Sequence, residues 1–272
     1  MLKITTLSVL QSILLGALQG LTEFLPVSSS AHLVVVPWLL GWRDPGLAYD
    51  VALHLGTLVA LLAYYRREWW EIAVAVLRPR SGGSDGVRSR RLLGLLAVAS
   101  VPGALVGLVF EKQAETAFRA PTLIAATLSL MGVALLLADR WTEKKRTIGE
   151  ITIIDAVLIG MSQALAIVPG VSRSGATITV GLLVGLRREE AANFSFMMAT
   201  PIIAGAGLLE ARKLADAGID SNVVVGFAAS LVFSLIAIAA LVKFVRARTY
   251  APFVWYRFAL AAVIAWVVFA RW

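Results

Sequence analysis

Polar side chains that could carry out chemistry stand close together at two places in this sequence. At the first, Gln19 and Glu23 lie four residues apart, so on a helix they would share one face. Glu23 could bind a divalent cation or act as a general base, with Gln19 as a neutral oxygen ligand. Ser29, in the serine run 28–30, could be a nucleophile and His32 a proton carrier. The alternative is structural: the serine hydroxyls satisfy Glu23, and His32 makes a hydrogen bond in the core.

The second place is the stretch Pro169–Thr177, which reads PGVSRSGAT. Proline and glycine interrupt a helix there and free the backbone. Ser172, Ser174 and Thr177 offer hydroxyl donors, and Arg173 supplies a planar cation that pairs well with phosphate. If a helix begins near Ser174, its first N–H groups and the positive end of its dipole would face the same anion. We therefore expect this stretch to bind an anionic group.

Several ionisable side chains in apolar surroundings have structural interpretations as well. Arg173 could be neutralised by Glu23 or Asp155 and hold two segments together. Asp50 and His54 lie four residues apart on one predicted helix face, and could either line a cavity or form a structural pair. Asp155 lies near the start of an apolar segment, which favours a structural role.

The elements that must position these residues follow from an apolar composition. The chain has 272 residues, of which 59% are hydrophobic and 15% charged, with a mean hydropathy of +0.82. Average soluble domains carry roughly 25% charged residues, and a soluble fold of this composition would expose too much apolar surface. The absence of cysteine excludes a disulfide scaffold and a thiol nucleophile. We expect an all-α polytopic membrane protein, with residues 1–272 forming a single integral membrane domain.

Six apolar runs are long enough to cross a hydrocarbon core of about 30 Å, which takes roughly 17–25 helical residues. They are Tyr49–Tyr65, Leu92–Phe110, Pro121–Ala138, Ala191–Leu209, Asn222–Val242 and Phe253–Ala270. Two further apolar regions, Leu7–Gly41 and Ile151–Gly185, are interrupted near Pro26 and Pro169. Their halves are too short to span comfortably, so we predict two re-entrant helical hairpins in addition to six transmembrane helices.

The basic residues orient these segments. If six spans alternate, 16 of the 25 lysines and arginines fall on one side, which marks that side as cytoplasmic and places both termini outside. The formal charge of +8 therefore needs no nucleic-acid partner. Arg173 and Arg257 lie in or beside apolar segments. The stretch Arg78–Arg91 is rich in glycine, serine and arginine, and we expect a flexible cytoplasmic connector.

The two interrupted regions resemble each other at a constant offset of 144 residues. The matched pairs are Gly16/Gly160, Gln19/Gln163, Leu21/Leu165, Val27/Val171, Ser28/Ser172 and Ser30/Ser174. Each half would hold one hairpin and three spans, so the second half would enter the membrane upside down. We predict inverted repeats of approximately residues 1–140 and 145–272. The two hairpin tips can then meet near the midplane and form one polar site.

Together these residues resemble a known family. The run Glu23–Ser29, with Gln19 before it and His32 after it, and the run Pro169–Thr177 are similar to the motifs of the bacterial undecaprenyl-diphosphate phosphatases, the bacitracin-resistance proteins. The resemblance covers essentially the whole chain, including Asn193–Phe196. Where the family has Glu or Gln at the first motif position, this sequence has Gln19.

The resemblance implies an inner-membrane enzyme that removes the terminal phosphate of undecaprenyl diphosphate and recycles the lipid carrier for cell-wall synthesis. It implies a divalent cation, Mg²⁺ or Ca²⁺, and an active site that faces the outer side. On this basis we expect Gln19 and Glu23 at the metal, and Glu23, Ser29, His32 and Arg173 in catalysis. The expected substrate-binding residues are Ser28, Ser172, Arg173, Ser174 and Thr177.

Other functions remain open at this point. Inverted repeats with broken helices are also typical of transporters, so a transporter or lipid flippase is the main alternative. A phosphatidic-acid-type phosphatase is excluded, because it needs a histidine after its Ser-Arg motif and both histidines lie upstream. The sequence leaves the nucleophile (Ser29, His32 or water), the preferred metal, the prenyl chain length and a homodimer undecided.

Overall fold

The computed structural model describes residues 7–43, 45–78, 83–110, 113, 117–217 and 220–271. The described residues form helices and connecting segments, and no strand. In chain order the helices are α1 (Val9–Phe24), α2 (Ser29–Leu40), α3 (Leu47–Tyr64), α4 (Arg66–Leu77), α5 (Gly83–Val109), η1 (Ala117–Arg119), α7 (Pro121–Trp141), η2 (Ile148–Glu150), α8 (Ile153–Ala164), η3 (Leu165–Ile167), α9 (Arg173–Leu183), α10 (Arg188–Ala217), α11 (Ser221–Ala247) and α12 (Ala251–Ala270). The predicted all-α class is confirmed.

The predicted membrane spans correspond to the long helices of the structure. Among the described residues, α5, α7, α10, α11 and α12 are each long and apolar enough to cross a membrane. A sixth span is reached if α3 and α4 are counted as one segment, which bends by 76° between Tyr64 and Arg66. The chain is therefore a multi-pass membrane protein.

The region around Arg78–Arg91 differs from the prediction. Residues 79–82 of the expected flexible connector lie outside the described residues, but Gly83–Arg91 form the first turns of α5, so the prediction of a flexible connector is wrong there. Helix α4 lies between the predicted span Tyr49–Tyr65 and the predicted connector Arg78–Arg91, where the sequence predicts no element. It buries Ile72 and Ala75 and leaves Trp70 exposed. Its apolar residues are too few for a span, so a pattern of long apolar runs does not predict this helix.

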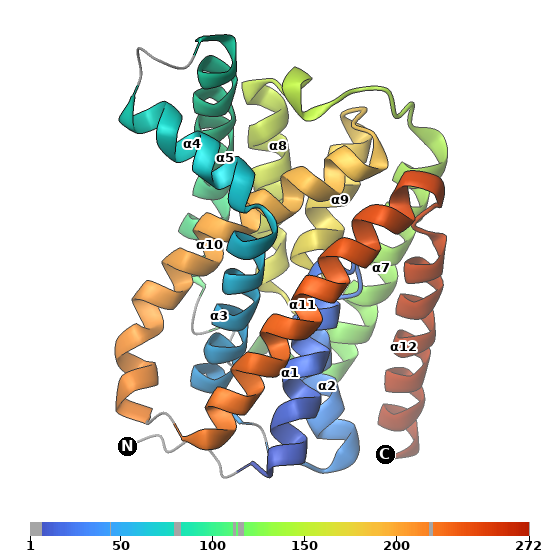
Figure 1. Cartoon of the computed structure of the whole chain (residues 1–272). Coiled ribbons are helices and arrows are strands. Elements are labelled where there is room, and N and C mark those ends of the chain that lie inside the picture. The colour runs from blue at the N-terminus through green and yellow to red at the C-terminus, as the bar shows by residue number, and fades with distance from the viewer. Residues whose placement is uncertain are drawn as a thin grey trace.

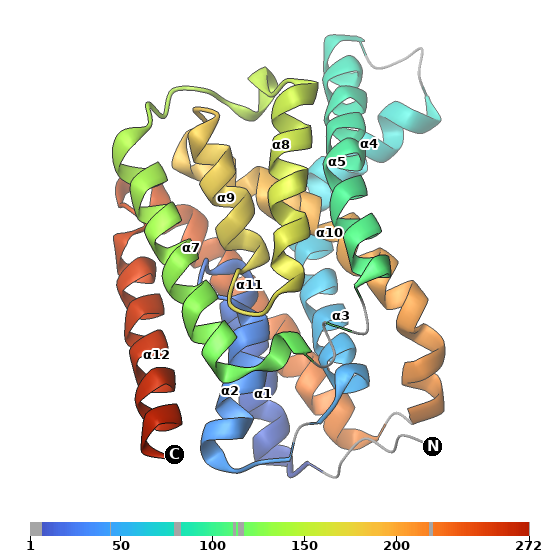
Figure 2. The ribbon, with the colours of Figure 1, turned by 180° about the vertical axis from the view of Figure 1, so that it is seen from behind.

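The two interrupted regions form helical hairpins that enter the molecule from opposite faces. The pair α1 and α2 lies toward the face where α12 ends, whereas α8 and α9 enter from the opposite face, and the two tips approach each other in the middle (Figures 1 and 2). The four arms have 16, 12, 12 and 11 residues, too few to cross a bilayer comfortably.

Both hairpins begin with the same capping device. Ser8 and Gln11 form a capping box at the start of α1, and Thr152 and Asp155 form one at the start of α8. These pairs stand 144 residues apart, as do the matched residues near the tips. The two hairpins thus share the same local structure at positions 144 residues apart. The division of the whole chain into two inverted repeats stays a prediction.

Asp155 has a second partner at the base of the second hairpin. Its carboxylate accepts a hydrogen bond of 2.6 Å from Arg146 Nη2. This hydrogen bond raises the pKa of the Arg146 guanidinium above its ordinary value. Asp155 therefore anchors the hairpin to the connector that precedes it, and does not pair with Arg173.

Close packing of small residues interleaves the two halves of the chain. Gly16 and Gly20 of α1 lie against the backbone of α11, where a Cβ atom at Gly20 would come within 2.5 Å of the Ser230 carbonyl oxygen. Gly160 of α8 lies in the same way against the Ala99 carbonyl of α5. Small residues let membrane helices approach each other closely. Each hairpin is thus held by a long helix from the other half.

Candidate active site

The tips of the hairpins are two loops, defined here as the first loop (residues 25–28) and the second loop (residues 168–172). Each loop ends in a serine with positive φ, 75° at Ser28 and 71° at Ser172. A non-glycine residue in this region costs about 1–3 kcal/mol. Each serine caps the helix that follows, because Ser28 Oγ accepts from the Ala31 N–H and Ser172 Oγ from the Gly175 N–H. The strained turns thus aim the N-termini of α2 and α9 toward one place.

Direct hydrogen bonds join the two loops. The Gly170 N–H donates to Ser28 Oγ over 3.0 Å, and Ser174 Oγ donates to the Leu25 carbonyl over 3.1 Å. Gly170 has a φ of 92° and lies against Thr127 of α7, where a Cβ atom would collide with the threonine hydroxyl. The second loop therefore needs glycine at this position.

A buried arginine holds both loops from behind. The Arg257 side chain on α12 is fully buried, and its guanidinium donates to backbone carbonyl groups. Those carbonyls belong to Pro26 of the first loop, Gly170 and Val171 of the second loop, and Thr127 and Leu128 of α7. The cation has no carboxylate partner among the described residues. Arg257 is therefore a structural clamp that also places positive charge beside the loops.

Glu23, in the last turn of α1, is the point where side chains from both hairpins meet. Arg173 Nη2 donates to its Oε1 atom over 2.7 Å, and the Ser29 hydroxyl donates to Oε2. Gln19 Nε2 donates to the same Oε2 over 3.0 Å. Ser29 is the first residue of α2 and Arg173 the first residue of α9. Two helix N-termini therefore present a hydroxyl and a cation to one buried carboxylate.

A cavity of about 360 Å³ opens beside this carboxylate. Four of the predicted site residues line it: Glu23, Ser29, Ser172 and Arg173. Its wall also includes His54 and Gln163, and it extends past the first turn of α3 and the C-terminal end of α5. The cavity therefore reaches toward the face from which the first hairpin enters.

Several buried polar atoms around the cavity lack a hydrogen-bond partner among the described residues. They are Gln19 Oε1, Arg173 Nη1 and both amide atoms of Gln163. Buried polar groups are nearly always satisfied, so each such atom needs an explanation. Acceptor oxygens beside a carboxylate suit a cation, and a free guanidinium N–H suits an anion.

The other predicted substrate ligands do not line the cavity. Ser28 and Ser174 connect the loops, as described above, and Thr177 Oγ1 lies 2.6 Å from Ser195 Oγ of α10. The Thr177 hydroxyl also contacts the Arg173 carbonyl over 2.8 Å. In this structure these hydroxyls support the loops, and their predicted contact with substrate stays a prediction.

His32 also lies away from the cavity. Its Nδ1 atom donates to the Ser28 carbonyl over 2.6 Å, so Nε2 accepts from the Tyr256 hydroxyl at 2.7 Å. The two rings stack with centroids 5.6 Å apart. Both ring nitrogens therefore have protein partners. The structure does not bring His32 to Ser29 and Glu23, and its catalytic role stays a prediction.

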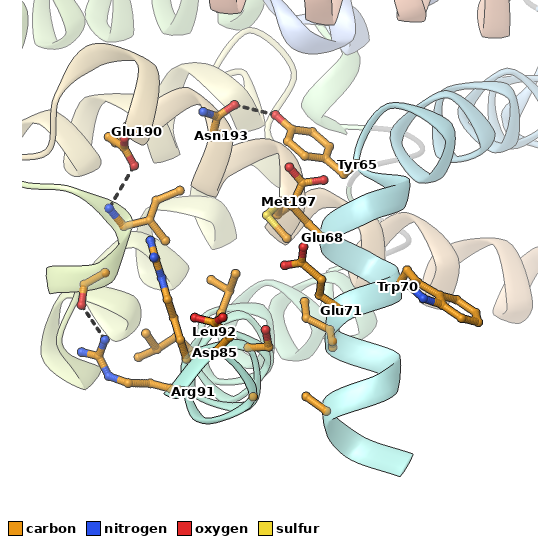
Figure 3. A pocket seen from close by; sticks show the side chains of 18 of the residues that line it. Tyr65, Glu68, Trp70, Glu71, Asp85, Arg91, Leu92, Glu190, Asn193 and Met197 are labelled. Atoms are coloured by element: carbon orange, nitrogen blue, oxygen red, sulfur yellow. Dashed lines mark hydrogen bonds between the residues drawn. The ribbon is translucent and has the colours of Figure 1, made fainter. Parts of the chain in front are cut away.

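A larger cavity of about 870 Å³ lies near the opposite face, between α4, the start of α5 and the start of α10. Glu68, Glu71 and Asp85 line it together with Arg91, which donates to the Gly149 carbonyl over 2.6 Å (Figure 3). None of the predicted site residues lines this cavity. We therefore place the candidate active site at the smaller cavity.

Comparison with known proteins identifies the family. The family model described as "Bacitracin resistance protein BacA" matches residues 12–263. The chain belongs to the BacA family. A relative from Moorella thermoacetica, named undecaprenyl-diphosphatase, is 50% identical over 97% of this chain and 100% of that protein. Relatives of the same name from Pelotomaculum thermopropionicum and Pelobacter propionicus are each 47% identical, over 97% and 96% of this chain and 97% and 98% of their own lengths.

The cation expected for the BacA family can be tested against the donor atoms at Glu23. Among the described residues, no group of three or more histidine, cysteine, aspartate or glutamate side chains could hold a metal ion. The carboxylate of Glu23 and the unpartnered Oε1 atom of Gln19 nevertheless fit one. Mg²⁺ in particular is bound by one or two carboxylates together with water and substrate phosphate.

Three residues at the candidate site were not among the predicted site residues. Arg257 and Tyr256 lie in an apolar run. Gln163 enters the sequence analysis only as the residue that matches Gln19 at the offset of 144. A basic residue within a membrane helix is a signal for a functional or paired role, and this signal was available for Arg257. Tyr256 offered none, because its contact with His32 depends on the packing of α12 against residues 224 positions away.

Proposed function

We propose that this protein is a membrane hydrolase that converts undecaprenyl diphosphate to undecaprenyl phosphate and phosphate, and so recycles the lipid carrier of cell-wall synthesis. The observation that carries the proposal is the convergence of Ser29 and Arg173 on Glu23 at one cavity. A hydroxyl, a carboxylate and a guanidinium are the groups that phosphoryl transfer needs. The names of the relatives support the same substrate.

Arg173 and the two helix N-termini would bind the diphosphate. Arg173 Nη2 is held by Glu23, which leaves Nη1 for a phosphate oxygen. The first N–H groups of α2 and α9 add partial positive charge at the same cavity. Apolar residues of the cavity wall, among them Val34, Ile202 and Ile203, suit the first isoprene units. The rest of the prenyl chain would lie in a lateral groove toward the lipid.

Glu23 is placed to accept the proton of the attacking hydroxyl. A bond forms between Ser29 Oγ and the terminal phosphorus, while the bond from that phosphorus to the bridging oxygen breaks. Undecaprenyl phosphate leaves with the bridging oxygen, and the hydroxyl proton passes to Glu23. Water then hydrolyses the phosphoserine and regenerates Ser29. Arg173 stabilises the negative charge on the phosphoryl oxygens. Direct attack by water on the terminal phosphorus is the alternative that a Ser29 variant distinguishes.

Glu23 and Gln19 would hold the divalent cation, Mg²⁺ or Ca²⁺. When bound, such an ion neutralises phosphate charge and polarises the phosphoryl group. Both side chains are buried. Because moving a diphosphate from water into an apolar site costs free energy unless positive charge is present, a cation held here would stabilise the bound substrate.

The proposed location is the inner membrane, with the active site open to the outer side. The excess of basic residues falls on the face opposite the end of α12. The cavity reaches toward the other face, which the charge rule places outside. Phosphate would then be released on the outer side of the membrane.

The test is phosphate release from undecaprenyl diphosphate by the purified full-length protein in detergent, with undecaprenyl phosphate as the control substrate. We expect release from the diphosphate only. If the protein releases no phosphate under any divalent cation, yet moves the lipid between the leaflets of a vesicle, the flippase alternative replaces this proposal. The structure favours chemistry over transport, because an attacking hydroxyl held by a carboxylate has no use in carrying a lipid.

A further inference from the structure

His54 on α3 lies beside the carboxylate at the centre of the site. Its Nε2 atom is 3.5 Å from Glu23 Oε2. The side chain lines the same cavity as Ser29 and Arg173, and 31% of its surface is accessible to solvent. The sequence left open whether His54 is structural or lines a cavity, and the structure puts it in the cavity wall.

The hydrogen bonding of the ring determines which nitrogen faces Glu23 as an electron-pair donor. His54 Nδ1 lies 2.7 Å from the Asp50 carbonyl oxygen, so Nδ1 carries a hydrogen and donates it. Histidines that bind metals characteristically donate their second ring N–H to a carbonyl or carboxylate, which fixes the ring and directs the lone pair of the other nitrogen at the metal. His54 has this arrangement, with Nε2 directed toward Glu23.

Three candidate donor atoms therefore belong to side chains that meet at Glu23. His54 Nε2 and Glu23 Oε2 face each other, and Gln19, whose amide nitrogen donates to the same Oε2, has an Oε1 atom without a partner among the described residues. A separation of 3.5 Å is what two ligands of one ion show when each bond is about 2.1 Å and the angle is near tetrahedral. Rotation of the Gln19 amide about its last bond exchanges its nitrogen and oxygen.

We propose that His54 Nε2 is a protein ligand of the divalent cation, together with Glu23 and Gln19. The inference rests on the proposed function and deepens it. A site that includes an imidazole nitrogen binds first-row divalent metals, with Mn²⁺ the weakest of the series, whereas Ca²⁺ takes oxygen ligands. With glutamine in place of a second glutamate, the nitrogen ligand compensates for the missing carboxylate and moves the preference of the site from Ca²⁺ toward Mn²⁺.

The competing interpretation is an ion pair between a protonated His54 and Glu23, with no role in metal binding. The two interpretations differ in what the cation contacts. A metal-bound imidazole gives a nitrogen coupling in the electron spin-echo spectrum of bound Mn²⁺, whereas an ion pair gives none. The chain has two histidines, so His32 is a built-in control.

The experiment uses the metal-free full-length protein in detergent, purified with a tag that contains no histidine. Mn²⁺ is titrated into the wild type, His54→Gln and His32→Gln, and free Mn²⁺ is measured by electron paramagnetic resonance. We expect His54→Gln to weaken Mn²⁺ binding at least about tenfold and to abolish the nitrogen coupling. We expect His32→Gln to keep the coupling. Competition with Ca²⁺ should favour Mn²⁺ in the wild type and lose that preference in His54→Gln.

The proposal is overturned if the wild type shows no nitrogen coupling, or if His54→Gln binds Mn²⁺ as tightly as the wild type. Glutamine is close to histidine in size, and unchanged helix content and elution volume establish that the variant is folded. Should it fail to fold, His54→Asn takes its place in the same measurements. A protein that binds Mn²⁺ through nitrogen but releases no phosphate contradicts the proposed function and leaves this inference standing.

Discussion

The two loops at the centre of the molecule share a backbone and differ in chemistry. Ser28 and Ser172 have nearly the same positive φ and cap their helices in the same way. In each loop this serine also lies 3.2 Å from the hydroxyl of the serine two positions later. The next position, the first of each helix, is Ser29 in one loop and Arg173 in the other.

This difference divides the proposed catalytic groups between the hairpins. The first hairpin supplies the hydroxyl, and the second supplies the cation. The carboxylate that both groups contact comes from the first hairpin alone, because the residue 144 positions after Glu23 is Ile167. One strained turn, used twice, thus brings unlike side chains to opposite oxygens of the same carboxylate. A repeated backbone can therefore position a site whose side-chain chemistry is not repeated.

The largest loss of activity is expected when the hydroxyl is removed at the first of the two equivalent positions. We expect Ser29→Ala to reduce phosphate release by about 10⁴-fold or more, as loss of a nucleophile does in other hydrolases. The control is Ser129→Ala, whose hydroxyl contacts the Ala125 carbonyl within α7 and which should keep normal turnover. Substantial turnover by Ser29→Ala would mean that water, not Ser29, attacks the phosphorus.

Removal of the cation at the second equivalent position should have the next largest effect. We expect Arg173→Ala to lower kcat by about 10²–10³-fold, since it removes charge that stabilises the transition state. Arg173→Lys should recover part of this, because it keeps the charge but loses the planar fork. Phosphate release is measured beside Arg66→Ala, an exposed arginine outside the cavity. Wild-type turnover by Arg173→Ala would remove Arg173 from the mechanism.

The two capping serines should differ in their contribution to stability. Ser172→Ala removes a helix cap, worth about 1 kcal/mol. Ser28→Ala removes a cap and also leaves the buried Gly170 N–H without its acceptor, which adds about 1–3 kcal/mol. The thermal unfolding midpoint in detergent should therefore fall further for Ser28→Ala. Equal losses for the two variants would show that the bond between the loops adds nothing.

The smallest expected effect concerns His32, which stands where the second hairpin has Ala176. Tyr256→Phe removes the hydroxyl that contacts His32 Nε2, a hydrogen bond worth about 0.5–1.5 kcal/mol. We expect a small drop in the unfolding midpoint and turnover within about tenfold of the wild type. A loss of kcat of a hundredfold or more, without unfolding, would instead support the predicted role of His32 as a proton carrier.

Sequence reasoning succeeded where a pattern is local. The long apolar runs gave the spanning helices, and the prolines beside serine clusters gave the two hairpins. The start of α9 was expected near Ser174 and lies at Arg173. Helix α4 was missed because its polar N-terminal turn hides a short amphipathic pattern.

The contacts within the site could not be read from the sequence in the same way. The pairing of Arg173 with Glu23 rather than Asp155 depends on how the tips meet, 150 residues apart along the chain. Likewise, the sequence could not separate His32 from His54. Both stand within four residues of another polar side chain in apolar segments, and only the packing of α3 and α12 shows which ring faces Glu23 and which faces Tyr256.

The clamp formed by Arg257 has a consequence for biosynthesis. The two loops that Arg257 contacts are translated long before α12. Helix α1 packs on α11, which is also translated near the end of the chain. The first hairpin therefore enters the bilayer before the contacts of its strained turn with α11 and Arg257 can form. We therefore expect the candidate site to be complete only after α12 has been inserted, and a chain that ends before this helix to enter the membrane without phosphatase activity.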